Sequence, residues 1–200
     1  MPKVSIIIPS YNRPQILKER ALRSALLQRF RDFEIIVVDH GSNPPLTHEG
    51  EHFPDNYKLI RIEKNSGIVS TARNRGLKEA KGEYILKLDA HCLVDKGFDE
   101  QLIKDHQPDW VQVPRRYRLD AEKWEIIEDG REPVDYEFIL FETLLKGFIW
   151  GAPWDEMTIK RKFIPIDDIM HFQGSCYFMT KDWFNRCGFL DTAYGSFAQE

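Results

Sequence analysis

The chain has 200 residues, enough for one globular domain with a sizeable core and slightly too few for two. With 42% hydrophobic and 30% charged residues it is a soluble folded protein, and a formal net charge of −4 gives no general attraction to nucleic acid or anionic membranes. Because no stretch approaches the roughly 20 apolar residues of a membrane span, and the N-terminus does not resemble a signal peptide, we expect a cytoplasmic protein.

The first ninety residues alternate strand patterns with helix patterns. Short β-branched apolar runs predict strands at 3–10, 33–42, 57–64 and 83–92, and helical periodicity predicts helices at 14–29 and 67–82. This alternation is typical of a parallel βαβ sheet, whose ligand crevice lies at the carboxyl ends of the strands. Three strand ends, 10–12, 39–41 and 89–91, are therefore expected to meet at one edge.

After residue 92 the pattern changes. We expect a short helix at 97–106, a strand at 109–119, a charged connection at 120–135, an amphipathic helix and a broken loop within 136–165, and a strand, turn and helix at 171–191. We predict one domain over 1–200, with a nucleotide-sugar-binding half at 1–106 and an acceptor half at 107–200. The aromatic residues Phe148, Trp150 and Trp154 could stack on a sugar ring, although such clusters more often belong to a core.

The residues that end the fourth predicted strand can bind a metal. Asp89 and His91 are separated by one residue, so in an extended chain their side chains point the same way. A carboxylate and an imidazole together can hold one divalent cation and leave positions open for phosphate oxygens. On spacing alone, a capping aspartate and a surface histidine are the more frequent outcome. The three cysteines, 92, 176 and 187, lack paired spacing and indicate neither disulfides nor a Cys-based zinc site.

A longer segment around these residues favours the metal site over the capping aspartate and surface histidine. "NSGIVSTARNRGLKEAKGEYILKLDAHC" resembles the family 2 glycosyltransferases and the related polypeptide N-acetylgalactosaminyltransferases, in which Asn-x-Gly, Ala-Arg-Asn, Gly-Glu-Tyr and Asp-x-Asp or Asp-x-His follow in this order. "VSIIIPSYNRP" and "GSCYFMTKDWFNRCGFLD" resemble other parts of family 2 enzymes. The resemblance covers residues 3–106 and 171–200, whereas 107–170 resembles no family we can name.

The resemblance implies an α/β protein with the GT-A nucleotide-diphospho-sugar transferase fold, a mostly parallel central sheet flanked by helices. It implies a metal-dependent glycosyltransferase that moves a sugar from a nucleotide-sugar, with UDP as the first choice, to a hydroxyl acceptor of unknown identity. Mn²⁺ or Mg²⁺ would be held by Asp89 and His91 and would stabilise the leaving diphosphate. The donor would contact Pro9, Ser10, Tyr11, Asp39, Asn65, Gly67, Arg73, Asp89 and Ala90. For Arg73, a solvated helix charge is the alternative.

One position departs from the family. The resembled enzymes carry two aspartates after the second strand, and the second receives the uracil N–H, whereas this chain has Asp39 followed by His40. A neutral imidazole could accept that hydrogen bond, Asp39 could substitute for it, or His40 could face solvent. The choice of UDP depends on which of these holds.

The acceptor-side carboxylate falls at the end of the chain. By the resemblance, Glu200 is the catalytic base or acceptor-orienting residue, and Asp191 is the second candidate, although a turn-capping role suits Asp191 better. The 200 residues are expected to be either a truncated form of a longer enzyme, with the acceptor half cut short at its C-terminus, or a reduced enzyme. Two other functions stay open: a non-catalytic nucleotide-sugar-binding module, and a sugar nucleotidyltransferase, against which the glycine-free "PSYNRP" argues.

Overall fold

The computed structural model describes residues 2–26, 32–47, 55–142, 148–171 and 174–193. Contacts divide the chain into two compact units, Met1–Gln112 with Ser175–Glu200, and Val113–Gly174. We describe each unit by itself. The first unit is discontinuous in sequence because the chain leaves it after the expected nucleotide half and returns for its last elements. The functional halves 1–106 and 107–200 remain a prediction.

The first unit is built on a five-stranded sheet in the order β3-β2-β1-β4-β7. Its strands are β1 (Val4–Ser10), β2 (Phe33–His40), β3 (Tyr57–Ile62), β4 (Tyr84–Leu88) and β7 (Cys176–Thr180). The first four are parallel, as the sequence predicts, and β7 runs antiparallel to β4 at the edge. The sheet is therefore mostly parallel, with the four predicted strands confirmed.

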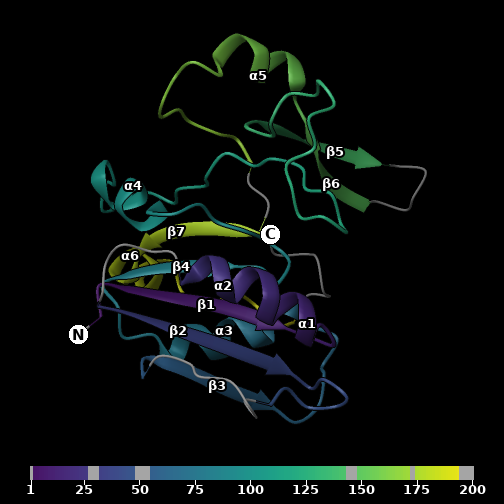
Figure 1. Cartoon of the computed structure of the whole chain (residues 1–200). Coiled ribbons are helices and arrows are strands. Elements are labelled where there is room, and N and C mark those ends of the chain that lie inside the picture. Colours follow the sequence, from purple (N-terminus) through teal and green to yellow (C-terminus); the bar gives the residue numbers. More distant parts are fainter. Residues whose placement is uncertain (1, 27–31, 48–54, 143–147, 172–173, 194–200) are drawn as a thin grey trace. The chain divides into compact units, whose positions relative to one another are not determined.

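Helices cover both faces of this sheet, which explains the continuous apolar runs of its strands. One face is covered by the helical stretch α1 (Pro14–Ile16), η1 (Leu17–Ala21, a π-helical turn) and α2 (Leu22–Ala25), and α3 (Val69–Glu79) covers the other (Figure 1). Ile6 and Ile8 point toward the first face and Ile7 toward α3, and all three are fully buried. The last part of the predicted helix 14–29 lies outside the described residues.

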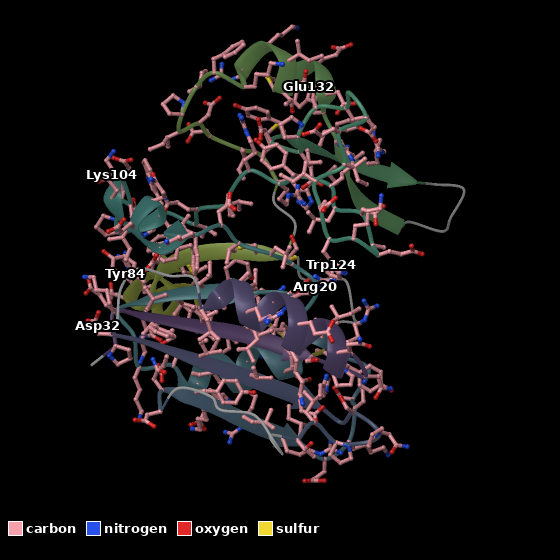
Figure 2. All side chains as sticks on the ribbon, viewed as in Figure 1. Arg20, Asp32, Tyr84, Lys104, Trp124 and Glu132 are labelled. Atoms are coloured by element: carbon pink, nitrogen blue, oxygen red, sulfur yellow. The ribbon has the colours of Figure 1, made fainter. Side chains whose placement is uncertain are left out.

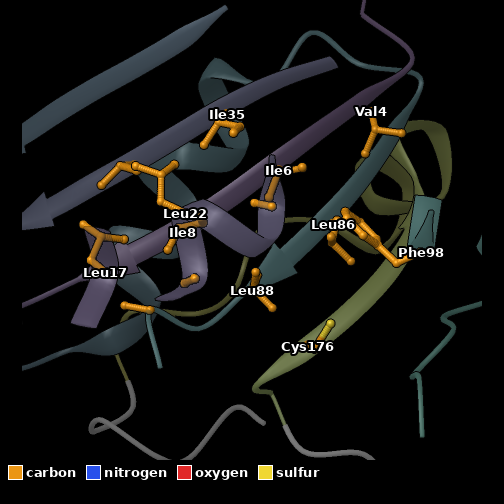
Figure 3. Close-up of a cluster of buried hydrophobic side chains, with 14 of the residues drawn as sticks. Val4, Ile6, Ile8, Leu17, Leu22, Ile35, Leu86, Leu88, Phe98 and Cys176 are labelled. Atoms are coloured by element: carbon orange, nitrogen blue, oxygen red, sulfur yellow. The ribbon is translucent and has the colours of Figure 1, made fainter. Parts of the chain in front are cut away.

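The core on the α1–α2 face is aliphatic (Figure 3). Leu17 and Leu22 from the helical stretch pack with Ile6, Ile8 and Leu86 from the central strands. Burying such side chains stabilises a fold by about 1.5–3 kcal/mol each. This core fixes the strands whose ends carry the polar residues considered below.

The edge of the sheet is joined by aromatic packing. The ring of Tyr84, labelled in Figure 2, stacks on Phe178 of β7 with centroids 5.1 Å apart, and His106 meets both rings edge-on. The predicted helix at 97–106 is present as α4 (Phe98–Lys104), and the strand, turn and helix expected at 171–191 are present as β7 and α6 (Lys181–Cys187).

Two predictions fail in the stretch between these elements. The strand expected at 109–119 is wrong, because within the described residues that segment makes only isolated bridges, such as Gln112 with Phe178. The helix expected within 136–165 is also wrong: β5 (Glu137–Glu142) and β6 (Phe148–Pro153) form an antiparallel pair, followed by α5 (Asp155–Arg161). Aromatic and β-branched residues there favour strands, and a partner strand supplies the hydrogen bonds.

The second unit, 113–174, is held by polar contacts around this pair. Arg161 forms a two-bond ion pair with Asp167, which also accepts a hydrogen bond from the Tyr136 hydroxyl. The imidazole of His171 packs on Gly151 of β6, where a Cβ atom would lie 2.4 Å from its Nε2. None of the helices in the described ranges has the length and hydropathy needed to cross a lipid bilayer.

Candidate functional site

The register of the sheet brings the predicted strand ends together. Ser10 at the end of β1 pairs with Asp39 of β2, and Asp39 pairs with Arg61 of β3. On the other side, Ile7 of β1 pairs with Lys87 of β4, so the end of β4 and the residues after it lie beside the end of β1. The expected edge of polar residues is therefore present in the first unit.

Asp39 is fully buried, and both of its carboxylate oxygens are hydrogen-bonded. Oδ1 accepts from the Ser42 N–H at 3.0 Å, and Oδ2 accepts from the Leu46 N–H at 3.1 Å and from Arg61 at 2.5 Å. Burial disfavours its ionised form, but the hydrogen bonds from Ser42, Leu46 and Arg61 outweigh burial and lower the pKa of Asp39. Asp39 therefore anchors the loop after β2 as an ionised carboxylate.

His40 points to the opposite face of the sheet and is only 5% exposed, so the solvent-facing alternative is wrong. Its Nε2 accepts a hydrogen bond from the Ser66 N–H at 3.2 Å and lies 3.0 Å from the Ser66 hydroxyl. An accepting Nε2 requires a neutral ring with its proton on Nδ1. Burial lowers the pKa of His40, and the charge of Asp39 opposes that change only in part.

The loops at this edge are tied to one another. The Asn12 N–H donates to the Ser42 hydroxyl at 2.9 Å, and the Asn12 side chain accepts from the Asn43 N–H at 2.8 Å. Gly41 has φ +75°, and a Cβ atom there would lie 2.3 Å from the Asn65 nitrogen, so only glycine fits. The Asn65 side chain in turn accepts from the Gly67 N–H at 2.6 Å. Asn65 and Gly67, both predicted donor contacts, thus shape one turn.

Three potential metal ligands follow β4. Ligand atoms of Asp89, His91 and Cys92 all lie within 4.8 Å of one another. His91 is half exposed, and its Nε2 is 3.9 Å from Asp89 Oδ2. This set of oxygen, nitrogen and sulfur donors fits a divalent cation with positions left open on the solvent side. Asp89 and His91 were expected from the sequence, whereas Cys92 was not.

The other predicted donor contacts have different surroundings. Ser10 is buried, and within the described residues its hydroxyl has no hydrogen-bond partner. Tyr11 is exposed, Ala90 is buried and Pro9 is partly buried. Arg73 on α3 is only 4% exposed, so the solvated-charge alternative is wrong for this residue. Their roles toward a donor remain predictions.

The residues expected on the acceptor side lie apart from this cluster in sequence. Asp191 is exposed, and its side chain accepts from the Ala193 N–H at 2.8 Å, as a turn-capping residue does. Glu200 lies outside the described residues. Of the aromatic residues, Trp154 packs edge-on against Phe138, while Phe148 and Trp150 belong to β6, and their side chains are outside the described part.

Four residues that shape this region were not predicted: Arg61, Ser66, Asn74 and Lys87. The side chain of Asn74 on α3 donates to the Leu190 carbonyl at 2.6 Å and accepts from the Leu190 N–H at 3.0 Å, which fixes the segment before Asp191 to α3. Lys87 offered a signal in the sequence, because it is a charge inside an apolar strand. Arg61 and Ser66 acquire partners only through strand register and loop packing.

Comparison with known proteins identifies the family of this chain. The family model described as glycosyl transferase family 2 matches residues 5–186. A cholesterol galactosyltransferase of Borreliella burgdorferi is 29% identical over 180 residues, which are 81% of this chain and 49% of that protein. Polypeptide N-acetylgalactosaminyltransferase 5 of Caenorhabditis elegans is 27% identical over 97% of this chain and 32% of its own length.

Solved structures show the same fold. A crystal structure of GalNAc-T7 with UDP, GalNAc and Mn²⁺ has a TM-score of 0.72 and 20% identity over 99% of this chain and 39% of that one. Staphylococcus aureus TarS 1-349 has a TM-score of 0.57 and 20% identity over 98% of this chain and 52% of its own. The GT-A fold predicted from the sequence is confirmed.

The chain spans at most half the length of these curated relatives. The family match nevertheless covers most of the chain, from the first residues of β1 to the end of α6, and includes the three strand ends and the cluster after β4. This chain belongs to glycosyl transferase family 2.

Proposed function

We propose that this chain is a metal-dependent glycosyltransferase that moves a sugar from a UDP-sugar to a hydroxyl acceptor. The observation that carries the proposal is the cluster of Asp89, His91 and Cys92, whose ligand atoms lie within 4.8 Å of one another at the end of β4. The ends of β1 and β2 lie beside it, at the edge where parallel α/β sheets bind their ligands.

The chain's own residues would divide the work. Asp89 and His91, with Cys92 as a third donor, would hold Mn²⁺ or Mg²⁺. Such a cation, when bound, neutralises the charge that grows on a leaving diphosphate. Among the two ions, a site with imidazole and thiol donors suits Mn²⁺ better than Mg²⁺, which prefers oxygen ligands.

The identity of the nucleotide base is less constrained than the metal site. UDP is supported by the family and by the UDP and UDP-GlcNAc in the complexes of similar structures. Because Asp39 and the Nε2 of His40 are engaged within the protein, base contacts would fall to the Ser10 hydroxyl and the loop backbone. The remaining proposed donor contacts are Pro9, Tyr11, Asn65, Gly67, Arg73 and Ala90.

The acceptor side is assigned from the resemblance. Glu200 is proposed as the catalytic base, with Asp191 as the second candidate, although the Ala193 contact favours a structural role for Asp191. A hydroxyl acceptor on a glycan, protein or lipid-linked molecule and a cytoplasmic location also remain predictions.

Calorimetric titration of UDP with and without Mn²⁺ tests the donor site. We expect Mn²⁺ to strengthen UDP binding at least tenfold in the wild type, and His91→Ala to remove that gain because one ligand is lost. His91 suits the test because it is half exposed, so its loss leaves the core intact. UDP should bind more tightly than CDP, GDP and ADP.

A cysteine pair provides the matched control. Cys92→Ser should weaken the Mn²⁺-dependent gain, whereas Cys187→Ser, at an exposed free cysteine in α6, should leave it unchanged. UDP affinity that is the same with and without Mn²⁺ would contradict the metal site. Metal-dependent UDP binding without sugar hydrolysis or transfer from any UDP-sugar would instead favour the non-catalytic binding module.

A further inference from the structure

A lysine lies in the middle of β4, between the core residues Leu86 and Leu88. Lys87 is fully buried, and its Nζ forms an ion pair with Asp89 Oδ1. Side chains two residues apart in an extended chain share a face, so Lys87 and Asp89 lie on the α3 side of the sheet. Burying an ammonium group costs free energy unless a nearby anion compensates its charge. The carboxylate of Asp89 is such an anion, and it helps this strand to accommodate a buried lysine.

Because of the ion pair, the two carboxylate oxygens of Asp89 lie beside different groups. Oδ1 is held by Lys87, and Oδ2 lies 3.9 Å from the His91 Nε2, on the side of the other potential metal ligands. A cation held at this cluster would therefore have one carboxylate oxygen of Asp89 free to bind it instead of two. The positive charge of Lys87 on the other oxygen would repel that cation.

We propose that Lys87 is a positioning residue that makes cation binding at Asp89, His91 and Cys92 depend on a bound nucleoside diphosphate. This inference rests on the proposed donor site. Without phosphates, the cation has few ligands and an adjacent positive charge. A diphosphate supplies further oxygen ligands and negative charge, which offset the ammonium group. Lys87 thereby makes binding of the metal depend on binding of the nucleotide-sugar donor.

The substitution Lys87→Met separates this role from a purely structural one. Methionine has a similar length and is apolar, but it removes only one partner of the ion pair, a change that is destabilising when the charge left behind is buried. Asp89 remains 23% exposed at its side chain, so water can solvate the freed oxygen. The charge that competes with the metal is removed while the ligands stay.

The affinity for Mn²⁺ alone is measured from the electron paramagnetic resonance signal of free Mn²⁺, with UDP absent and then saturating. In Lys87→Met we expect Mn²⁺ to bind about tenfold more tightly without UDP, and at most about threefold more tightly with it. Lys3→Met is the matched control, because Lys3 forms an ion pair with Glu83 just before the start of β4, and both of its affinities should match the wild type. A merely structural lysine would leave metal affinity unchanged or weaken it.

The outcomes distinguish this inference from the proposed function. If UDP strengthens Mn²⁺ binding in the wild type and His91→Ala removes the effect, but folded Lys87→Met binds Mn²⁺ alone no more tightly, the role of Lys87 is overturned and the donor site stands. If the wild type gains nothing from UDP, both are overturned. Should Lys87→Met not fold, the wild type decides: Mn²⁺ affinities with and without UDP that agree within about threefold contradict the inference.

Discussion

Neighbouring residues at the end of β2 act on different loops. Asp39 points to one face of the sheet and fixes the loop through Ser42 and Leu46, whereas His40 points to the other face and fixes the turn at Ser66. Alternation along a strand accounts for this division. The position that departs from the family is therefore a buried, hydrogen-bonded imidazole, and its protonation state matters for the edge that would bind a nucleotide.

Replacing His40 tests that protonation state. Because the pKa of His40 is lowered in the folded protein, the unfolded chain binds a proton more readily, and the stability contributed above pH 6.5 is lost as the pH falls through the folded pKa. We expect the wild type to be less stable to urea at pH 5 than at pH 7.5. His40→Gln, which keeps an acceptor for Ser66 but does not titrate, should show a smaller difference.

Nuclear magnetic resonance titration of the imidazole gives an independent check. A folded-state pKa of His40 above 6.5 would show that the ring is protonated more easily than in the unfolded chain, contrary to the neutral ring inferred from the Ser66 contact. Equal pH dependence of urea stability in the wild type and His40→Gln would also contradict a lowered pKa of His40 in the folded protein.

At the scale of elements, α3 approaches the sheet closely at Gly76. A Cβ atom at that position would lie 2.5 Å from Ile7 Cγ2 and 3.2 Å from Val38 Cγ2. The same helix carries the buried Arg73 and the Asn74 side chain that binds Leu190. The close approach of α3 thus positions residues on both the donor side and the segment before Asp191.

Gly76→Ala should destabilise the protein. Alanine improves helix propensity by about 1 kcal/mol, but the added methyl overpacks the contact with Ile7, and such changes cost about 1–3 kcal/mol. We expect a net loss of about 1 kcal/mol in the free energy of unfolding, measured in urea. The double variant Gly76→Ala/Ile7→Ala should lose less than the sum of the single changes, because the second substitution makes room for the methyl. Strict additivity would argue that the contact is not limiting.

At the scale of the whole molecule, the residues proposed for the donor belong to one of two units. The candidate metal cluster, the strand ends and α3 lie in 1–112, and β7, which follows in sequence at 176–180, completes that sheet. The segment 113–174 has its own strand pair and polar network. We therefore expect donor binding to require only the first unit.

Removal of the second unit tests this separation. Gln112 exchanges two backbone hydrogen bonds of 2.8 Å with Phe178 of β7, so a short Gly-Ser linker can replace 113–174 between backbone segments that already lie together. We expect the shortened chain to unfold cooperatively and to bind UDP with Mn²⁺ within about threefold of the full chain by calorimetry, and to lose transfer. Loss of UDP binding in a folded shortened chain would place donor contacts in the removed segment.

The parallel sheet and the approximate positions where its strands end follow from local patterns in the sequence. Runs such as residues 3–10 are buried on both sides, and a continuous apolar pattern followed by polar residues predicts such a strand without knowledge of its neighbours. The motif around Asp89 and His91 likewise predicted their placement together, but the expected extended geometry is wrong: β4 ends at Leu88, and a turn in which the Cys92 N–H donates to the Asp89 carbonyl at 3.0 Å brings the two side chains together.

Other features depended on partners distant in sequence. The aromatic stretch within 136–165 could pair as strands only because a complementary segment lies a few residues away, and a local pattern does not specify that pairing. Arg61 meets Asp39 through the register of β2 and β3, and Ser66 meets His40 through a loop contact. Lys87 was visible in the sequence as a charge in an apolar strand, but its ion pair with Asp89 depends on a burial that only the packed sheet and α3 create.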